Sequence, residues 1–586
     1  MEERYYTCMF GGEAGYAVMS AGTMVAKAAG RNGLWSVVVN EYPSLIKGGL
    51  NTCLVRLGEK PLAAYEEDLD FLGVLSQPAF DMNVGKVKKG GVVLYDGKSV
   101  KPDLEKVPEG VILYSVELLQ SISGDAAKVM SNSALLGAFC AVSGFPKELL
   151  AAVMSSEFRK ESVREQNIAI LEKGYTIASE KLVRQPVFSL RLQPDNQTEK
   201  MLINGNEAIA IGAIQAGCKF SAGYPMTPGS SVLSYLADHG ADYGVVFKQA
   251  EDEIAAINML IGAAYTGVRS LGSTSGGGFA LMVEALGFAA QAELPIVMVN
   301  AQRGGPSTGQ PTRTAQADLN FVLHASQGEF PRFVVAPGDM EECFYETIRL
   351  FNVTDQFQVP GILLTDKYLA DSAMTRPFFA TKDVKIERGK MADEEYLAAH
   401  QPYKRYEITQ DGISVRAIPG QAGGRHIATS YTLGEDGFYS SGNREYAGLE
   451  PEVTVAMMDK WYRKEPFMEK AVPGIKLHGP QQADLTIIGW GSTKGAILEA
   501  VEKAKLEGLS VNFMQVLYIS PFPVKAVETV LKNVKKSLLI EGNKTAQLGG
   551  ILRAHTGYKT DACYLKYDSR PFTPTGILTK IKEVLS

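Results

Sequence analysis

Short apolar runs alternate with amphipathic helical patterns along most of this chain, and this alternation predicts three α/β units. The first unit, residues 1–185, opens with an apolar run at 5–10 and a glycine-rich turn at 11–15. A helical pattern continues to about residue 29, and a β-rich run follows at 34–40. A strand, a glycine turn, a helix and a second strand are typical of a Rossmann-like start. Further strands are predicted at 69–75, 91–95 and 111–114, and helices over 133–182.

The rest of the chain divides by the same patterns. Residues 186–200 are polar and contain two prolines, which predicts a linker. Strands and helices alternate over 201–375 and again over 483–586, so each segment is predicted to form a doubly wound parallel sheet. Residues 376–482 mix charged and aromatic positions with glycine turns, which predicts an irregular connector. We expect this connector either to contact a partner or to be a surface insertion without function.

Composition and charge exclude several classes of protein. The chain has 586 residues, 45% of them hydrophobic and 21% charged, as in ordinary globular proteins. The net charge of −6 makes nucleic acid an unfavourable partner. The longest apolar stretch, 278–299, contains Glu284, Gln291 and Glu293, so a membrane span is not expected. The first residues lack the basic and apolar regions of a secretory signal.

The cysteines indicate a reducing environment. The chain has six, and no two lie within about thirty residues of each other, so neither an iron–sulfur nor a zinc motif is present. We expect reduced, mostly buried thiols and a cytoplasmic location, with no metal site in this chain. If electrons pass through an iron–sulfur cluster, another chain must hold it.

Two glycine- or proline-rich turns are candidates for ligand binding. The turn at 11–15 departs from a dinucleotide fingerprint because Phe10 occupies the first glycine position, so it favours either a phosphate contact or a tight strand–helix turn. The run Tyr-Pro-Met-Thr-Pro-Gly at 224–229 has two prolines that fix the backbone and extend the residues before them. It is predicted either to present Thr227 to a ligand or to be a plain helix entry.

An acidic run at 251–253 precedes an alanine-rich helix. Acidic residues in a first turn stabilise a helix by themselves, which suffices to explain at least two of the three. Glu253, however, shares a helical face with Ile257, Leu260 and Ile261. A carboxylate on an apolar face needs a proton-bearing partner or must stay protonated, and a ligand ring nitrogen would serve.

Two further loops follow predicted strands. Residues 273–278, Ser-Thr-Ser-Gly-Gly-Gly, either approach a ligand closely or form a simple strand–helix turn. Residues 302–314 contain Arg303 and Arg313 among glycines and prolines, at the carboxyl end of a strand predicted at 295–300. Open α/β sheets bind ligands at this edge, and arginines recognise carboxylates or phosphates there.

These motifs in order resemble a known family. The runs at 40–49, 224–228 and 304–311 are similar to those of the α subunits of 2-oxoacid:ferredoxin oxidoreductases, in the form with a γ-type domain fused ahead. The resemblance covers essentially the whole chain and is greatest to the 2-oxoglutarate branch. It implies a γ-type Rossmann-like domain, a thiamine-enzyme pyrimidine-binding domain at 201–375 and a transketolase C-terminal-like domain at 483–586.

The resemblance also implies roles for residues. Glu253 fits the thiamine-enzyme pattern Glu-x-Ala-Ala with Gly262 nine positions on, and it implies a catalytic glutamate that activates the aminopyrimidine ring of thiamine diphosphate. Thr227 and Arg313 match substrate-carboxylate contacts, and Arg303 is the alternative arginine. The expected cofactor contacts, besides Glu253, are Pro225, Ser275 and Gly276.

The implied reaction is a reversible oxidative decarboxylation in which coenzyme A accepts the acyl group and ferredoxin the electrons. A β subunit would hold the diphosphate, Mg²⁺ and a [4Fe-4S] cluster, in an α2β2 heterotetramer. The alternatives are a pyruvate or branched-chain 2-oxoacid enzyme, or a scaffold subunit without catalysis.

Overall fold

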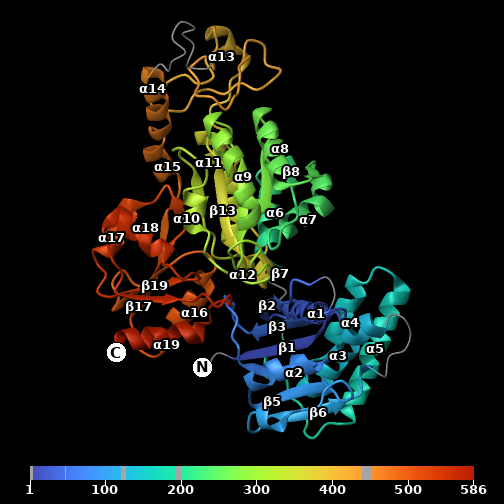
Figure 1. The fold of residues 1–586 in the computed structure, drawn as a ribbon. Coiled ribbons are helices and arrows are strands. Elements are labelled where there is room, and N and C mark those ends of the chain that lie inside the picture. The colour runs from blue at the N-terminus through green and yellow to red at the C-terminus, as the bar shows by residue number, and fades with distance from the viewer. Residues whose placement is uncertain (1–3, 46–47, 120–126, 193–199, 438–450) are drawn as a thin grey trace. The chain divides into compact units, whose positions relative to one another are not determined.

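The computed structural model describes residues 4–45, 48–119, 127–192, 200–437 and 451–586, and divides into two compact units. The first unit comprises residues 1–204 with the short segments 371–378 and 573–575, and the second comprises the remainder. Figure 1 draws most of the first unit in blue and teal and the second in green to red. The described residues form three sheets with helices, which confirms the predicted α/β class. Among the described residues, every helix is too short or too polar to span a bilayer.

The first unit is built on an eight-stranded sheet. Strand β1 (Tyr5–Glu13), helix α1 (Val18–Arg31) and strand β2 (Trp35–Glu41) form the predicted start. Strand β3 (Leu50–Gly58) pairs antiparallel with both β1 and β2 and therefore lies between them. The glycines at 11 and 12 are part of β1, so the turn begins later than predicted. A Cβ on Gly11 would lie 2.9 Å from that of Ala79, so this glycine serves close packing.

The remaining elements of the first unit complete the sheet and a helical layer. The sheet order is β6-β5-β4-β1-β3-β2-β14-β7, with parallel pairing from β6 to β1 and antiparallel pairing from β1 to β7. Strand β7 lies where the predicted linker meets the predicted second unit, and strand β14 lies at the far end of that second unit. The other bounds are β4 (Leu69–Val74), α2 (Gln77–Asn83), β5 (Val87–Asp96), β6 (Ile112–Val116), α3 (Ala127–Ser143), α4 (Lys147–Glu157), α5 (Glu161–Ser179), β7 (Lys200–Ile203) and β14 (Ala373–Pro377).

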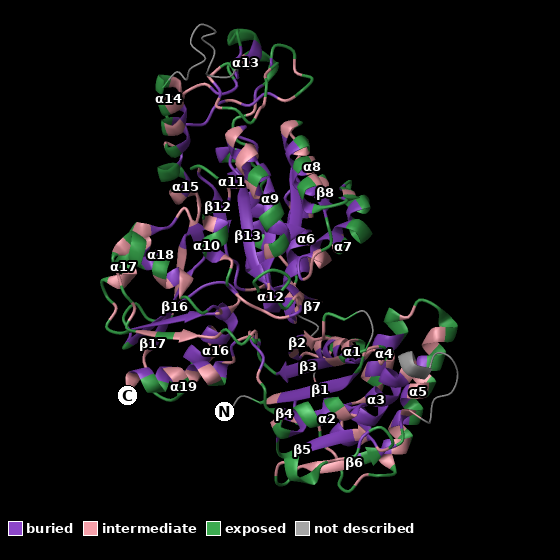
Figure 2. Cartoon of the chain, viewed as in Figure 1, coloured by how far each residue is buried: buried purple, intermediate pink, exposed green. Residues whose placement is uncertain are grey.

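The second unit begins with a seven-stranded sheet of order β18-β12-β13-β11-β10-β8-β9, parallel except for the pair β12–β18. Figure 2 shows strand β13 buried between helices whose outer faces are exposed. The strands are β8 (Phe220–Gly223), β9 (Val246–Gln249), β10 (Ser270–Thr274), β11 (Val297–Gln302), β12 (Phe333–Val335), β13 (Gly361–Asp366) and β18 (Tyr518–Ser520). The helices are α6 (Gly205–Gln215), α7 (Ser230–His239), α8 (Glu253–Tyr265), α9 (Gly276–Gln291), α10 (Leu319–Leu323), α11 (Met340–Phe357) and α12 (Lys367–Asp371).

A five-stranded sheet of order β15-β17-β16-β19-β20 completes the second unit. Apolar residues of both sheets, among them Leu364, Ile488, Trp490 and Met514, form one continuous core. This shared core and strand β18 join the C-terminal segment firmly to the seven-stranded sheet. The bounds are β15 (Ile475–His478), β16 (Leu485–Gly489), α16 (Thr493–Leu506), β17 (Val511–Val516), α17 (Val524–Leu531), β19 (Ser537–Glu541), α18 (Gln547–Thr556), β20 (Ala562–Leu565) and α19 (Pro574–Leu585).

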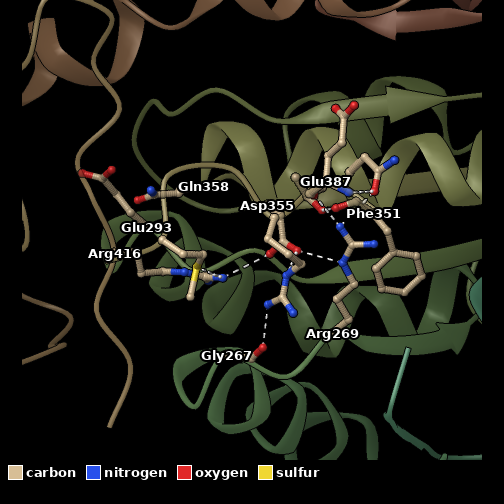
Figure 3. Close-up of polar contacts among 12 residues, drawn as sticks. Gly267, Arg269, Glu293, Phe351, Asp355, Gln358, Glu387 and Arg416 are labelled. Carbon is tan, nitrogen blue, oxygen red and sulfur yellow. Dashed lines mark hydrogen bonds and ion pairs between the residues drawn. The ribbon is translucent and has the colours of Figure 1, made fainter. Parts of the chain in front are cut away.

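The predicted connector, 376–482, is mostly loop within the described residues, with three short helices, α13 (Glu394–Ala399), α14 (Pro451–Tyr462) and α15 (Glu465–Ala471). Its last part differs from the prediction, because β15 pairs with β17 in the C-terminal sheet. It is attached by a buried carboxylate, Asp355 of α11, whose side chain is 3% exposed. Arg269 and Arg388 each place Nε 2.8 Å from Asp355 Oδ2, and Arg416 places Nη2 3.2 Å from Oδ1. Figure 3 shows Arg269 and Arg416 converging on Asp355. Two of the three arginines belong to the connector, which is therefore packed against the sheet domain.

A second carboxylate, Glu293, holds helix α14. It lies between α9 and β11 and forms ion pairs with Lys460 and Lys464, all of them buried. Lys464 Nζ is 2.9 Å from Glu293 Oε2, and Arg405 Nη2 donates to the Glu293 carbonyl at 2.9 Å. Burial alone would raise the pKa of Glu293, but the attraction of these three cations outweighs it and holds the pKa well below its usual range.

Candidate active site

Glu253 lies in the first turn of α8 and is 3% exposed. Asp252 caps the helix, since its Oδ1 accepts a 2.7 Å hydrogen bond from the amide of Ala255. Asp252 and Glu251 precede the first turn and are exposed. Glu253 instead points with the buried apolar face of the helix, and its Oε1 is buried without a hydrogen-bond partner. This carboxylate oxygen is therefore available to a ligand.

The carboxylate of Glu253 is directed at the first turn of α9. Strand β10 ends at Thr274, Ser275 is the N-cap, and glycines occupy 276–278. A Cβ at Gly278 would lie 2.6 Å from Glu253 Oε1 and 2.1 Å from Thr274 Oγ1. Both distances are well below van der Waals contact, so only glycine lets the two elements approach this closely. Ser275 Oγ is likewise buried and without a partner.

The loop at 224–229 rests on the end of β10. Ser273 Oγ donates to the carbonyl of Gly229 at 2.7 Å, and a Cβ on Gly229 would lie 2.4 Å from the carbonyl oxygen of Thr274. The amide of Gly278 donates to Met226 Sδ at 3.2 Å. The loop is thereby fixed beside the N-terminus of α9, with Pro225 exposed and Thr227 half-buried.

Arg303 follows strand β11 and reaches this loop, because its Nη1 donates to the carbonyl of Thr227 at 2.7 Å. Its Nε is buried and unpartnered. Burial lowers the pKa of Arg303, and the charge of Asp318 opposes this shift. Burial likewise raises the pKa of Asp318, opposed by a hydrogen bond from Asn300 and by Arg303. Asp318 also faces the N-terminus of α9, since a Cβ on Gly276 would lie 2.4 Å from its Oδ2.

Residues 304–313 form a tight turn that places Arg313 at the same edge. The amide of Gly304 donates to the carbonyl of Arg313 at 3.1 Å, and the amide of Gln310 donates to the carbonyl of Gly304 at 2.7 Å. Gly309 has φ 53°, and a Cβ there would lie 1.9 Å from the carbonyl oxygen of Gly304. The structure joins Arg303 to Thr227 by a side-chain bond, whereas half-buried Arg313 is linked to that pair through the backbone of this turn.

Buried polar atoms without partners gather at this edge of the sheet. They lie at the start of α8 and near the carboxyl ends of β10 and β11: Glu253 Oε1, Ser275 Oγ, Asn300 Oδ1 and Arg303 Nε. More than about 90% of buried polar groups in proteins have a partner, so such a gathering indicates a ligand site. Asn300 and Asp318 also lie at this site and were not among the predicted residues. The signal for Asn300 is a polar residue near the end of a buried strand, whereas Asp318 is the N-cap residue of α10, sixteen residues after β11 ends.

Family comparisons identify the class of protein that carries this site. Residues 211–448 match the family described as pyruvate flavodoxin/ferredoxin oxidoreductase, thiamine diP-bdg. Residues 7–177 match pyruvate ferredoxin/flavodoxin oxidoreductase, and residues 483–562 match core domain II of pyruvate:ferredoxin oxidoreductase. The fold and site thus define an oxidoreductase subunit with a thiamine diphosphate-binding domain.

Comparison with individual relatives narrows the class of protein further. The 2-oxoacid:ferredoxin oxidoreductase subunit alpha of Saccharolobus solfataricus is 31% identical, over 98% of this chain and 97% of that protein. The 2-oxoglutarate oxidoreductase subunit KorA of Mycobacterium tuberculosis is 27% identical over 93% of this chain and 86% of its own. A 2-oxoglutarate:ferredoxin oxidoreductase from Magnetococcus marinus, solved with 2-oxoglutarate, coenzyme A and succinyl-CoA bound, matches all of both chains with 33% identity and a TM-score of 0.91.

The chain belongs to the family of 2-oxoacid:ferredoxin oxidoreductase α subunits. The predicted family, its fused N-terminal region and the enzyme class are thereby confirmed. Because these relatives are named as single subunits, a partner subunit completes the enzyme.

Proposed function

We propose that this chain is the α subunit of a 2-oxoglutarate:ferredoxin oxidoreductase that converts 2-oxoglutarate and coenzyme A to succinyl-CoA and carbon dioxide, reversibly, with electrons passing to ferredoxin. The observation that carries the proposal is the buried, unpartnered carboxylate oxygen of Glu253 among other unpartnered polar atoms. The solved relative with 2-oxoglutarate, coenzyme A and succinyl-CoA bound supports this choice of substrates. Pyruvate and branched-chain 2-oxoacids are the alternatives.

The residues at this site fit thiamine diphosphate. Glu253 Oε1 is buried and lacks a hydrogen-bond donor, which a protonated aminopyrimidine nitrogen would supply. Pro225, Ser275 and Gly276 would lie around the ring, because they flank the same end of α9. When bound, the cofactor supplies a carbanion-stabilising centre for decarboxylation. The chain itself orients the ring, places the Glu253 carboxylate to exchange a proton with the ring nitrogen and keeps water from that carboxylate.

Recognition of the substrate carboxylates would fall to Thr227, Arg303 and Arg313. 2-Oxoglutarate carries two carboxylates, and guanidinium groups bind carboxylates through paired hydrogen bonds. The buried, unpartnered Nε of Arg303 is already placed beside Thr227. Arg313 lies beyond the same turn, so the two arginines suit a substrate with two anionic ends.

The other half of the site would belong to a β subunit that holds the diphosphate, Mg²⁺ and a [4Fe-4S] cluster. All six cysteines of this chain are free thiols and five are buried, which supports a cluster on another chain. Large apolar side chains are exposed around the site, at Tyr224, Ile254, Leu281 and Phe321. Exposed apolar groups near a half-formed site are typical of a protein interface. We propose an α2β2 assembly in the cytoplasm.

The test uses this chain co-expressed with its β-type partner and supplied with thiamine diphosphate, Mg²⁺ and coenzyme A. Reduction of ferredoxin or a low-potential dye is followed anaerobically with 2-oxoglutarate, pyruvate and 2-oxoisovalerate in parallel. At least tenfold higher kcat/KM for 2-oxoglutarate is expected. Preference for another acid would overturn the substrate assignment, and inactivity of an assembled, cofactor-loaded complex with every acid would favour a scaffold without catalysis.

A further inference from the structure

Gln316 lies three residues beyond Arg313 and is 1% exposed. All its polar groups bond to the C-terminal α/β segment. Its amide donates to the carbonyl of Gly542 at 2.8 Å, and its Oε1 accepts from the amide of Gly542 at 2.8 Å. Its Nε2 donates to the carbonyl of Trp490 at 3.0 Å, and its carbonyl accepts from Asn543 Nδ2 at 3.1 Å. The side chain and backbone of this one residue thus join the loop that carries Arg303 and Arg313 to the ends of β16 and β19.

The slot that receives Gln316 is itself fixed by hydrogen bonds. Glu541 Oε2 accepts from Trp490 Nε1 at 3.1 Å and from Asn543 Nδ2 at 2.8 Å. The same carboxylate also accepts from the amides of Leu548 and Gly549 in α18. A Cβ on Gly491 would lie 2.9 Å from Gln316 Nε2, so this glycine makes room for the amide. Because the acceptors are held in place, the slot specifies both the position and the orientation of Gln316.

Two further contacts hold the same loop. Thr314 Oγ1 donates to Asp366 Oδ1 at 3.0 Å, at the end of β13. Ser569 of the C-terminal segment lies against the turn, since a Cβ on Gly304 would be 3.2 Å from its Oγ. The loop is therefore held at both of its ends by groups outside it.

We infer that Gln316 is a positioning residue through which the C-terminal α/β segment holds the arginine loop, residues 303–314, in its substrate-binding conformation. This inference rests on the proposed role of Arg303 and Arg313 and adds a task for the C-terminal segment. Gln316 does not itself contact substrate. It acts by limiting the conformations of the loop, so its loss weakens substrate binding more than it slows the chemistry.

The test compares Gln316→Met with Tyr518→Phe in the assembled enzyme. Methionine keeps the side-chain volume but loses both side-chain hydrogen bonds. Tyr518→Phe removes a buried 2.9 Å bond from strand β18 of the C-terminal segment to Glu346 of helix α11 without touching the loop, and Arg349 still pairs with that carboxylate. Asn543→Ala removes one bond to the Gln316 carbonyl together with the Asn543 bond to Glu541, and it is the second variant if Gln316→Met does not assemble.

In Gln316→Met we expect KM for the preferred 2-oxoacid to rise about tenfold, equivalent to about 1.4 kcal/mol, with kcat within about twofold. Hydrogen exchange at the amides of Gly304, Gln310 and Arg313 should quicken at least about tenfold. Asn543→Ala should change both KM and the exchange rates by about threefold, and Tyr518→Phe should change neither KM nor the exchange rates. Unchanged exchange, or an equal KM rise in Tyr518→Phe, would overturn the inference. Because exchange needs no turnover, it decides the anchoring even if the proposed substrate is wrong.

Discussion

Replacement of Glu253 by glutamine tests the centre of the proposed site. The substitution keeps the shape of the side chain and removes its ability to hold a proton for the cofactor ring. Proton transfer by a positioned side chain contributes about 10²–10⁴-fold to a rate. We therefore expect turnover to fall by about 10²–10⁴, or roughly 3–5 kcal/mol in the activation barrier. The assay is anaerobic dye reduction by the purified complex.

Removing the Glu253 carboxylate should lower turnover but raise the stability of the chain. Glu253 Oε1 is buried without a partner, and such a group costs about 1–3 kcal/mol. Glu253→Met removes it at similar volume, so the cofactor-free chain should become more stable by about that amount, measured by the denaturation midpoint. Glu251→Gln, at the exposed acid two positions earlier, is the matched control and should change neither property. Turnover of Glu253→Gln within twofold of wild type, in an assembled complex, would refute the assignment.

Three further changes test the surrounding structure. Gly278→Ala would place a Cβ 2.6 Å from the unpartnered carboxylate oxygen and should lower turnover at least about tenfold, whereas Gly277→Ala, with its nearest neighbour 3.8 Å away, should be neutral in the same dye assay. Arg303→Met should raise KM for the 2-oxoacid by about 10–100-fold, as loss of a charged hydrogen bond of about 1.5–3 kcal/mol predicts; an unchanged KM would assign recognition elsewhere. Glu293→Gln leaves buried Lys460 without its carboxylate and should cost about 3–5 kcal/mol in urea unfolding. Since its neighbours depress the pKa of Glu293, this stabilisation is fully present above about pH 4.3 and is lost as the pH falls below that value. A wild-type-to-variant difference that stays constant from pH 7 to pH 3 would contradict that origin.

The ion pairs of the connector explain how an irregular segment is held in a defined place. Its loops contain few apolar residues able to form a core, and its small cores centre on side chains such as Leu397 and Tyr406. Asp355 and Glu293 instead bind connector cations in buried positions. Breaking such a pair leaves an uncompensated buried charge, which is costly, so the attachment is specific. The connector contacts its own sheet domain, and its contact with a partner stays a prediction.

Local sequence predicted individual elements well where periodicity is pronounced. The acidic first turn and the apolar face of the helix starting at Glu253 are confirmed, because a helical period of 3.6 residues alone decides which side chains share a face. Local sequence did not predict which distant segments pair in the sheets. Strand β3 lies between β1 and β2, and strand β18 joins a sheet almost two hundred residues away in sequence. Nothing local distinguishes these pairings from the direct crossover of a Rossmann start.

The sequence by itself determined the α/β class, the family and the candidate side chains Glu253, Thr227, Arg303 and Arg313, because short motifs and periodicity are local properties. Only the tertiary structure decided which of these groups lack partners and which meet. The unpartnered oxygen of Glu253, the bond from Arg303 to Thr227 and the anchoring of Gln316 all depend on backbones far apart in sequence. Whether a buried polar atom is satisfied depends on every neighbour that folding brings to it, and no local pattern contains that information.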